Sequence, residues 1–194
     1  MFYQQCIRLF KDIFLEEHIF SEIKLEQKDL TDHYHQDLPY CFLDRIIVAS
    51  QYRESKKIIE RYKYESDREY RERLTDFYLH IAGIEFADEG TKKNWCIVPV
   101  PMHWSRYILR GFDHIGLLAT LFSEKIGIPY QTILKTRYRP RQSRLNRTSR
   151  LANKTNAFRL LNGLAPIPEY IILIDDVISS GSTANACAEV LKQA

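Results

Sequence analysis

The amino-acid sequence predicts an α/β domain in which a mainly parallel sheet is flanked by helices. Short apolar runs of strand character alternate along the chain with segments whose apolar residues recur at helical spacing. The most informative polar residues directly follow one of these runs, and parallel sheets bind their ligands at the carboxyl ends of the strands. A length of 194 residues suits one domain with a small extension.

The individual elements follow from the same patterns. Strands are predicted at residues 45–49, 95–100, 132–135, 157–160 and 170–174. Helices are predicted at residues 54–64, 70–81, 113–125 and 183–192. In the third helix Ile115, Leu118, Ala119 and Phe122 share one face, and Gly127 follows as a stop signal. Residues 161–168 are predicted to be a turn region, and residues 1–40 a helix followed by an irregular polar stretch.

Composition and cysteine spacing indicate a soluble protein of a reducing compartment. No apolar run is long enough to span a bilayer, and the N-terminal residues carry acids and lack the basic flank of a secretory signal. The four cysteines lie far apart in sequence, which excludes a Cys-x-x-Cys metal pair. We therefore expect a cytoplasmic protein without membrane insertion.

Residues 171–183, IILIDDVISSGST, carry the strongest functional signal. Asp175 and Asp176 lie at the carboxyl end of an apolar segment that is typical of a buried strand. Gly181 follows among hydroxyl side chains, where a helix is predicted to begin. Small residues let backbone N–H groups approach a phosphate, and a helix N-terminus favours negative charge. The two carboxylates can accept hydrogen bonds from a ribose diol and lie close to hydrated Mg²⁺. The loop is therefore expected to bind a phosphorylated sugar.

Other sites that place acids after a strand fit this sequence less well. A Walker B strand needs an upstream G-x-x-x-x-G-K-[ST] loop and a dinucleotide fold needs G-x-G-x-x-G, and the chain contains neither. A phosphate-transferring aspartate usually has an acid two residues on, where Val177 stands. The remaining alternative has no ligand site: a buried strand is followed by a serine-rich, capped helix, and Asp175 and Asp176 are merely residues of the turn between them.

The same stretch resembles the phosphoribosyl-pyrophosphate (PRPP) motif of type I phosphoribosyltransferases. The resemblance implies that Asp175 and Asp176 hold the ribose hydroxyls and Mg²⁺, the latter through PRPP or water. It implies that the loop for the 5′-phosphate consists of Ser179, Ser180, Gly181, Ser182 and Thr183. In purine-using members the position of Ser179 is often an aspartate that assists the base, so the serine argues against a purine acceptor.

The order of further motifs resembles the ComF family of competence-associated proteins. The run Val-Pro-Val-Pro at residues 98–101 precedes Arg110-Gly111-Phe112, with Asp113-His114 where the family usually has Asn-Gln. Matches continue with Leu118-Ala119, Gln142, Leu145, Arg150, Asn153 and Ala157-Phe158. The resemblance implies a pyrophosphate loop of Pro99, Val100, Pro101 and Met102, and Arg110 could reach a phosphate oxygen. Taken alone, without the resemblance, this region favours a surface turn with solvated arginines over a phosphate site.

Residues 135–159 carry nine basic side chains and no acid, although the net charge of the whole chain is only +3. Such a local cationic segment predicts an anionic partner. By resemblance it is a mobile loop in which Arg137, Arg139 or Arg141 meets the leaving pyrophosphate. It could instead bind single-stranded DNA with Tyr138 as a stacking platform, or be a solvated hairpin.

The two ends of the chain depart from the family pattern. ComF relatives usually begin with a four-cysteine zinc ribbon, but only Cys6 and Cys41 lie in the first 43 residues, so the zinc is expected to be lost. We expect residues 1–43 to form a small, helical N-terminal extension and residues 44–194 a phosphoribosyltransferase-like domain with a shortened C-terminus. A missing last strand would expose a sheet edge, which a second copy or a partner of the competence machinery could cover.

Two functions follow from the resemblance. The first is a phosphoribosyltransferase (a pentosyl-transferring glycosyltransferase) that binds Mg²⁺–PRPP and releases pyrophosphate, in a ComF-like role in DNA uptake. The second is a non-catalytic module on the same fold that binds a nucleotide or single-stranded DNA. Neither a general base nor the acceptor nucleophile stands out in the sequence.

Overall fold

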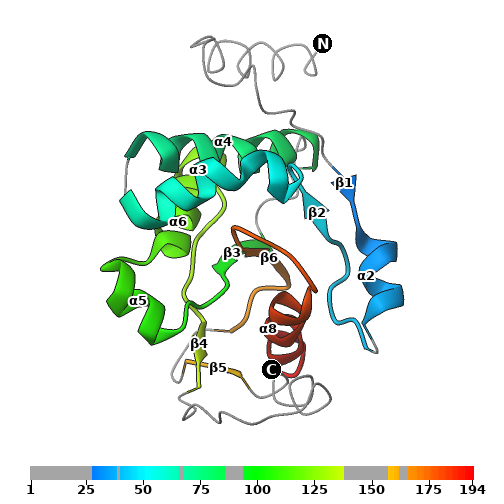
Figure 1. Cartoon of the computed structure of the whole chain (residues 1–194). Coiled ribbons are helices and arrows are strands. Elements are labelled where there is room, and N and C mark those ends of the chain that lie inside the picture. The colour runs from blue at the N-terminus through cyan, green and yellow to red at the C-terminus, as the bar shows by residue number, and fades with distance from the viewer. Residues whose placement is uncertain (1–27, 39, 66–67, 86–93, 138–156, 162–165) are drawn as a thin grey trace, which may run out of the picture.

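The computed structural model describes residues 28–38, 40–65, 68–85, 94–137, 157–161 and 166–194, which hold six helices and six short strands (Figure 1). The helices are α2 (Thr31–Asp37), α3 (Tyr52–Glu65), α4 (Arg68–Glu85), α5 (Trp104–Arg110), α6 (His114–Ile126) and α8 (Ser182–Lys192). The strands are β1 (Lys28–Asp29), β2 (Ile47–Val48), β3 (Trp95–Pro99), β4 (Leu134–Thr136), β5 (Phe158–Leu160) and β6 (Tyr170–Ile174).

The centre of the fold is the parallel pair of strands β3 and β6. Their register runs from Trp95 opposite Tyr170 to Pro99 opposite Ile174, so the two strands end side by side. A parallel bridge between Ile97 and Tyr130 extends this pair on the other side of β3. Both strands are apolar along their whole length, as expected for strands covered on two faces.

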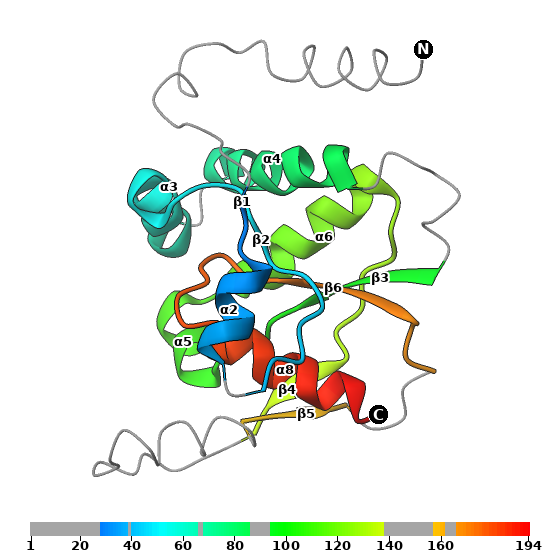
Figure 2. The same ribbon diagram turned by 90° about the vertical axis from the view of Figure 1, so that its right-hand side faces the viewer.

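Successive side chains of β3 pack into two separate hydrophobic cores, because neighbouring residues of a strand point to opposite faces of the sheet. Ile97 packs with the apolar faces of helices α3, α4 and α6, where Tyr62 and Leu118 are fully buried. Cys96 and Val98 pack instead with helix α8 and strands β4 and β5. Helices thus cover both faces of the central pair, with α3, α4 and α6 on one side and α8 on the other (Figures 1 and 2).

The remaining strands form two antiparallel pairs. Strand β4 pairs with β5 through the register of Lys135 opposite Arg159. Strand β2 pairs with β1, which lies in the predicted N-terminal extension. The structure therefore confirms an α/β arrangement with a parallel central pair, but the described strands form three two-stranded sheets in place of a single, mainly parallel one.

Most predicted elements have a counterpart, whereas two helices were not predicted. Helix α5 follows the turn after β3 and buries none of its residues, although Trp104, Tyr107 and Ile108 recur at helical spacing and are exposed. Its N-cap residue is His103, whose side chain accepts a hydrogen bond from the Ser105 amide, and its C-cap residue is Gly111 in the left-handed region. Helix α2 falls in the predicted irregular stretch and buries only Tyr34. Among the described helices, none has the length and apolar character needed to cross a bilayer.

Candidate functional site

The loop between β6 and α8 carries the predicted phosphate-binding residues. Asp175 and Asp176 follow directly after the last residue of β6, and Ser182 opens helix α8. Gly181 precedes this helix with a φ of 67°, a left-handed conformation that glycine adopts without strain. The N-cap residue Gly181 has no side chain and so makes no side-chain capping hydrogen bond. The Ser-Gly-Ser bend therefore lies at the N-terminus of the helix, where orphan backbone amides can meet an anion.

The turn after β3 lies beside this loop. Pro99 is the residue opposite Ile174, and the Val100 amide donates a 2.9 Å hydrogen bond to the carbonyl of Ile174. Val100 is buried, while Pro101 and Met102 are half-buried. The parallel register thus brings the predicted pyrophosphate turn, residues 99–102, next to the two aspartates at one edge of the sheet.

The Asp176 carboxylate is held inside the molecule by two other helices. Its Oδ2 lies 2.6 Å from Nζ of Lys63 on α3 and 3.0 Å from Nε2 of His114 on α6, and the Asp176 side chain is 8% exposed. Burial alone would raise the pKa of this carboxyl, but the hydrogen bond from His114 and the charge of Lys63 lower it. Asp176 is therefore an ionised, paired carboxylate at neutral pH.

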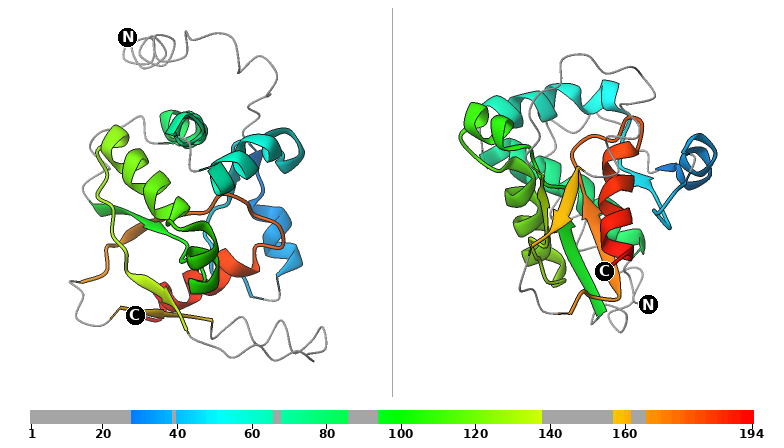
Figure 3. Two further views of the ribbon diagram at one scale, coloured as in Figure 1. Left: turned by 60° about the vertical axis from the view of Figure 1, so that its left-hand side comes forward. Right: turned by 90° about the horizontal axis from the view of Figure 1, so that it is seen from below.

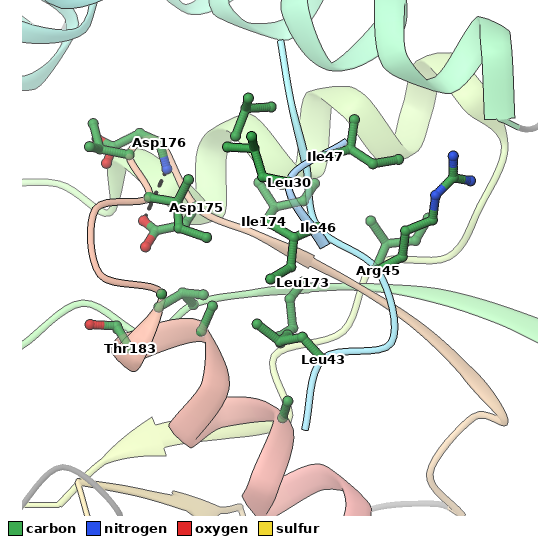
Figure 4. Close-up of a pocket in the computed structure, with 18 of the residues that line it drawn as sticks. Leu30, Leu43, Arg45, Ile46, Ile47, Leu173, Ile174, Asp175, Asp176 and Thr183 are labelled. Atoms are coloured by element: carbon green, nitrogen blue, oxygen red, sulfur yellow. Dashed lines mark hydrogen bonds between the residues drawn. The ribbon is translucent and has the colours of Figure 1, made fainter. Parts of the chain in front are cut away.

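The Asp175 carboxyl is in a different state. Its Oδ1 accepts a 2.9 Å hydrogen bond from the amide of Asp176, and its backbone carbonyl accepts one of 3.0 Å from the Tyr78 hydroxyl. Burial, and then the neighbouring charge of Asp176, raise the pKa of the Asp175 carboxyl to about 7. In Figure 4 the two carboxyl groups point apart, that of Asp175 toward the side where Thr183 lies in the first turn of helix α8. Asp175 is thus the member of the pair whose charge a bound cation would stabilise.

Arg110 reaches the site through His114. Its Nη1 lies 3.0 Å from Nδ1 and 2.9 Å from Nε2 of His114, and 3.6 Å from the sulfur of Met102. A continuous chain of polar contacts therefore runs from Arg110 through His114 and Asp176 to Lys63. It ties helices α5, α6 and α3 to the acidic end of β6.

Three residues near the loop were missed by the sequence analysis. Lys63 has a recognisable signal, because it follows Ile59 by four residues on the inward face of α3 and is only 17% exposed. A lysine at such a position indicates a buried acid as its partner. Tyr78 on α4 and Tyr34 on α2 carry no such signal, since an aromatic residue on a helix face is usually core.

A large cavity opens beside the loop. Its volume is about 1210 Å³, and it lies between the segment around strand β2, strand β6 and helix α8. Most of the labelled residues in Figure 4 are apolar, while Asp175, Asp176 and Thr183 bring polar atoms to one end. The apolar lining residues include Leu30, Leu43, Ile46, Ile47, Leu173 and Ile174.

Several predicted residues lie away from this cluster or outside the described residues. Arg137 directly follows strand β4, and its amide donates a 2.8 Å hydrogen bond to the carbonyl of Ala157. Tyr138, Arg139, Arg141 and Cys6 lie outside the described residues. Cys41 is half-buried, and the part of the chain that the structure describes holds no group of three or more His, Cys, Asp or Glu side chains that could bind a metal.

Comparison with curated proteins finds three informative relatives. The chain is 30% identical over 141 residues to competence protein ComFC of Streptococcus pneumoniae, which covers 72% of this chain and 57% of the relative. It is 28% identical over 158 residues to competence protein F of Haemophilus influenzae, covering 77% and 67%. It is 34% identical over 100 residues to DNA utilization protein YhgH of Salmonella typhi, covering 49% and 42%.

The match thus spans 57% of the length of the streptococcal relative and 42% of the Salmonella relative. No protein-family model matches the chain. No solved structure matches it either. The similarity to relatives that bear competence names extends over most of the chain and agrees with the motif order described above. These relatives and the shared motif order support membership of the chain in the ComF family.

Proposed function

We propose that this protein binds Mg²⁺–PRPP between the loop of residues 175–183 and the turn of residues 99–102, as a phosphoribosyltransferase-type protein acting in DNA uptake. The observation that carries the proposal is the parallel register of β3 and β6, with Pro99 opposite Ile174. It places a carboxylate pair, a helix N-terminus that begins at a glycine and a proline-bounded turn at one edge of the sheet. PRPP presents a diol, a 5′-phosphate and a pyrophosphate, which match these three features in chemistry.

Each part of the loop has a distinct task in this proposal. The amides at the start of α8, together with the hydroxyls of Ser180 and Ser182, bind the 5′-phosphate. These two hydroxyl groups already lie 2.8 Å apart, at the exposed surface of the loop. Asp175 accepts hydrogen bonds from the ribose diol, while Asp176 keeps the end of the strand in place through Lys63 and His114.

The residues of the site fit a magnesium ion that arrives with its substrate. In the described chain no cluster of three potential ligands could hold a metal unaided. Mg²⁺ is commonly bound through one or two carboxylates and otherwise through phosphates and water, and Asp175 offers one such carboxylate. A bound ion would neutralise the charge that develops on the departing pyrophosphate.

Arg110 is suited to support pyrophosphate release. It lies beside Met102 of the pyrophosphate turn, and its guanidinium can donate two parallel hydrogen bonds to a phosphate. Its contact with His114 holds it in this position before the ligand arrives. Fixed cationic donors of this kind stabilise charge in a transition state without reorganisation.

Calorimetry tests the proposal directly. The wild-type protein should bind PRPP in the presence of Mg²⁺ and bind it more weakly when the metal is chelated. Asp175→Asn should weaken PRPP binding at least tenfold, whereas Asp44→Asn, an exposed acid paired with Lys192, should leave it unchanged. A wild-type protein that binds no PRPP would exclude this function.

A second function, binding of single-stranded DNA, is favoured by the hairpin of β4 and β5. Lys135 and Arg159 face each other directly across the two strands. Like charges at such opposite positions repel, and Arg137, which directly follows β4, is an exposed third cation of this segment. A cluster of this kind gains free energy when a phosphate backbone neutralises it. The names of the relatives, which refer to competence and to DNA utilization, agree with this binding.

A further inference from the structure

The N-terminal segment packs directly against the candidate phosphate loop. Helix α2 places Tyr34, which is 5% exposed, against the turn that precedes α8. The hydroxyl of Tyr34 donates a 2.8 Å hydrogen bond to the backbone carbonyl of Ser179. Figures 2 and 3 show α2 lying beside the chain that joins β6 to α8. A residue 145 positions away in sequence thus holds the loop from outside the motif.

The ring of Tyr34 also covers Gly181. A Cβ atom built on Gly181 would lie only 2.8 Å from Cδ1 of Tyr34 and 3.1 Å from its Cε1. Such a distance is too short for any side chain, so the ring rests on the backbone of the glycine itself. The glycine is needed here for two reasons, its φ of 67° and the close approach of this ring.

A second contact fixes the first turn of α8 to the same segment. Oδ1 of Asn185 accepts a 2.6 Å hydrogen bond from the amide of Phe42, and its Nδ2 donates one of 2.8 Å to the carbonyl of Tyr40. Both ends of the Asn185 amide are therefore used by the extension. Tyr34, Tyr40 and Phe42 together hold the loop before Gly181 and the helix after it.

We propose that Tyr34 is a positioning residue of the phosphate loop, which makes the N-terminal extension part of the ligand site. The carbonyl and the N–H group of one trans peptide point in opposite directions. By holding the carbonyl of Ser179, Tyr34 therefore turns the amide of Ser180 away from α2 and toward the open side of the loop. This inference rests on the proposed function and adds the amide of Ser180 to the groups that meet the 5′-phosphate.

The first test measures the loop itself and needs no ligand. In Tyr34→Phe the ring still covers Gly181 but the hydrogen bond to Ser179 is lost. We expect backbone amides of residues 179–183 to exchange with deuterium several-fold faster in this variant, while those of β3 are unchanged. Tyr40→Phe is the matched control, because the side chain of Tyr40 is exposed in the same segment. Equal exchange in Tyr34→Phe and the wild type would overturn the inference.

The second test separates phosphate binding from a general loss of structure. Ribose 5-phosphate should bind Tyr34→Phe roughly 2- to 10-fold more weakly than the wild type, the range of one neutral hydrogen bond. Magnesium pyrophosphate, which the proposed function assigns to the turn of residues 99–102, should bind both proteins equally. Equal weakening of the two ligands indicates a merely structural role and rejects the positioning role.

The two proposals fail in different ways. If the wild type binds neither PRPP nor ribose 5-phosphate, the proposed function is wrong, and deuterium exchange still decides whether Tyr34 orders the loop. If the wild type binds both ligands and Tyr34→Phe binds them equally well, the site stands and the positioning role is wrong. Tyr34→Ala, which also uncovers Gly181, should weaken ribose 5-phosphate binding further than Tyr34→Phe.

Discussion

The loop after β6 and the hairpin of β4 and β5 are both candidate sites for anions, but they are built in opposite ways. The loop keeps its charged groups buried and paired, with Asp176 held by Lys63 and His114. The hairpin sets the half-buried Lys135 against the exposed Arg159, and no acid of the described residues forms an ion pair with either side chain. Charges in the loop are therefore coupled to folding, whereas charges in the hairpin affect only binding. Substitutions of charged residues in the loop should therefore change the free energy of unfolding, whereas those in the hairpin should change only the binding of an anionic ligand.

The largest effect is expected from breaking the buried pair. Lys63→Met leaves the Asp176 carboxylate with only His114 as its partner, and removing one member of a buried pair typically costs about 3–5 kcal/mol. Urea unfolding at pH 7 measures the loss. Lys56→Met, on the exposed side of the same helix, should cost less than about 0.5 kcal/mol. A similar, small cost for both variants would show that the loop charges are not coupled to folding.

Asp175→Asn should increase stability while it weakens the proposed ligand binding. The pKa of Asp175 is raised to about 7 in the folded protein, so folding disfavours its charge and the wild type loses stability as pH rises from about 4 to 7. At about 1.4 kcal/mol for each tenfold change in the ionisation equilibrium, the asparagine variant should be about 2–4 kcal/mol more stable at pH 8. Near pH 4 the two proteins should unfold at similar urea concentrations.

Asp176→Asn is the matched control for this pH dependence. The pKa of Asp176 is lowered, so its charge stabilises the fold at neutral pH and is lost only under more acidic conditions. The asparagine variant at this position should therefore be less stable than the wild type at pH 7. The same sign for both variants would contradict the different states of the two carboxyl groups.

Gly181→Ala should cost about 1–3 kcal/mol, because alanine is strained in the left-handed region and its Cβ would meet the ring of Tyr34. Gly127 offers the comparison, since its φ is 72° but a Cβ there would have no neighbour within 4 Å. Gly127→Ala thus reports backbone strain alone. The difference in melting temperature between the two variants measures the contact with Tyr34, and equal losses would mean that the ring does not constrain the loop.

Local patterns were sufficient to predict the central elements. Strand β6 and helix α8 lie within a residue of their predicted bounds, because an apolar run, a glycine and a helical apolar face each act over short range. Helix α6 begins one residue after its predicted start, where Asp113 caps the amide of Gly116. The motif residues 175–183 could therefore be assigned to a strand, a loop and a helix from sequence alone.

Contacts between distant segments could not be predicted in the same way. The partners of Asp176 and Ser179 are Lys63 and Tyr34, which no motif connects to the loop. The pairing of β2 with β1 joins two segments that are distant in sequence, and strand propensity alone does not predict which strands pair. The sequence therefore indicates which residues gather at the end of β6, while the structure adds what holds them there.

The smallest change in stability is expected in the hairpin. Lys135→Gln combined with Arg159→Gln removes two like charges that face each other, so the unfolding free energy should stay within about 0.5 kcal/mol of the wild type or rise slightly. If the hairpin binds single-stranded DNA, the slope of log affinity against log salt should fall by about 1.4, since each phosphate contact contributes about 0.7 on single strands. Fluorescence anisotropy of a labelled oligothymidine over a salt series measures this slope.

The control variant is Asp175→Asn, which should leave the slope unchanged, because the two regions are separate. A reduced slope in Asp175→Asn would instead place the DNA at the loop, and the contrast between the two regions would no longer hold.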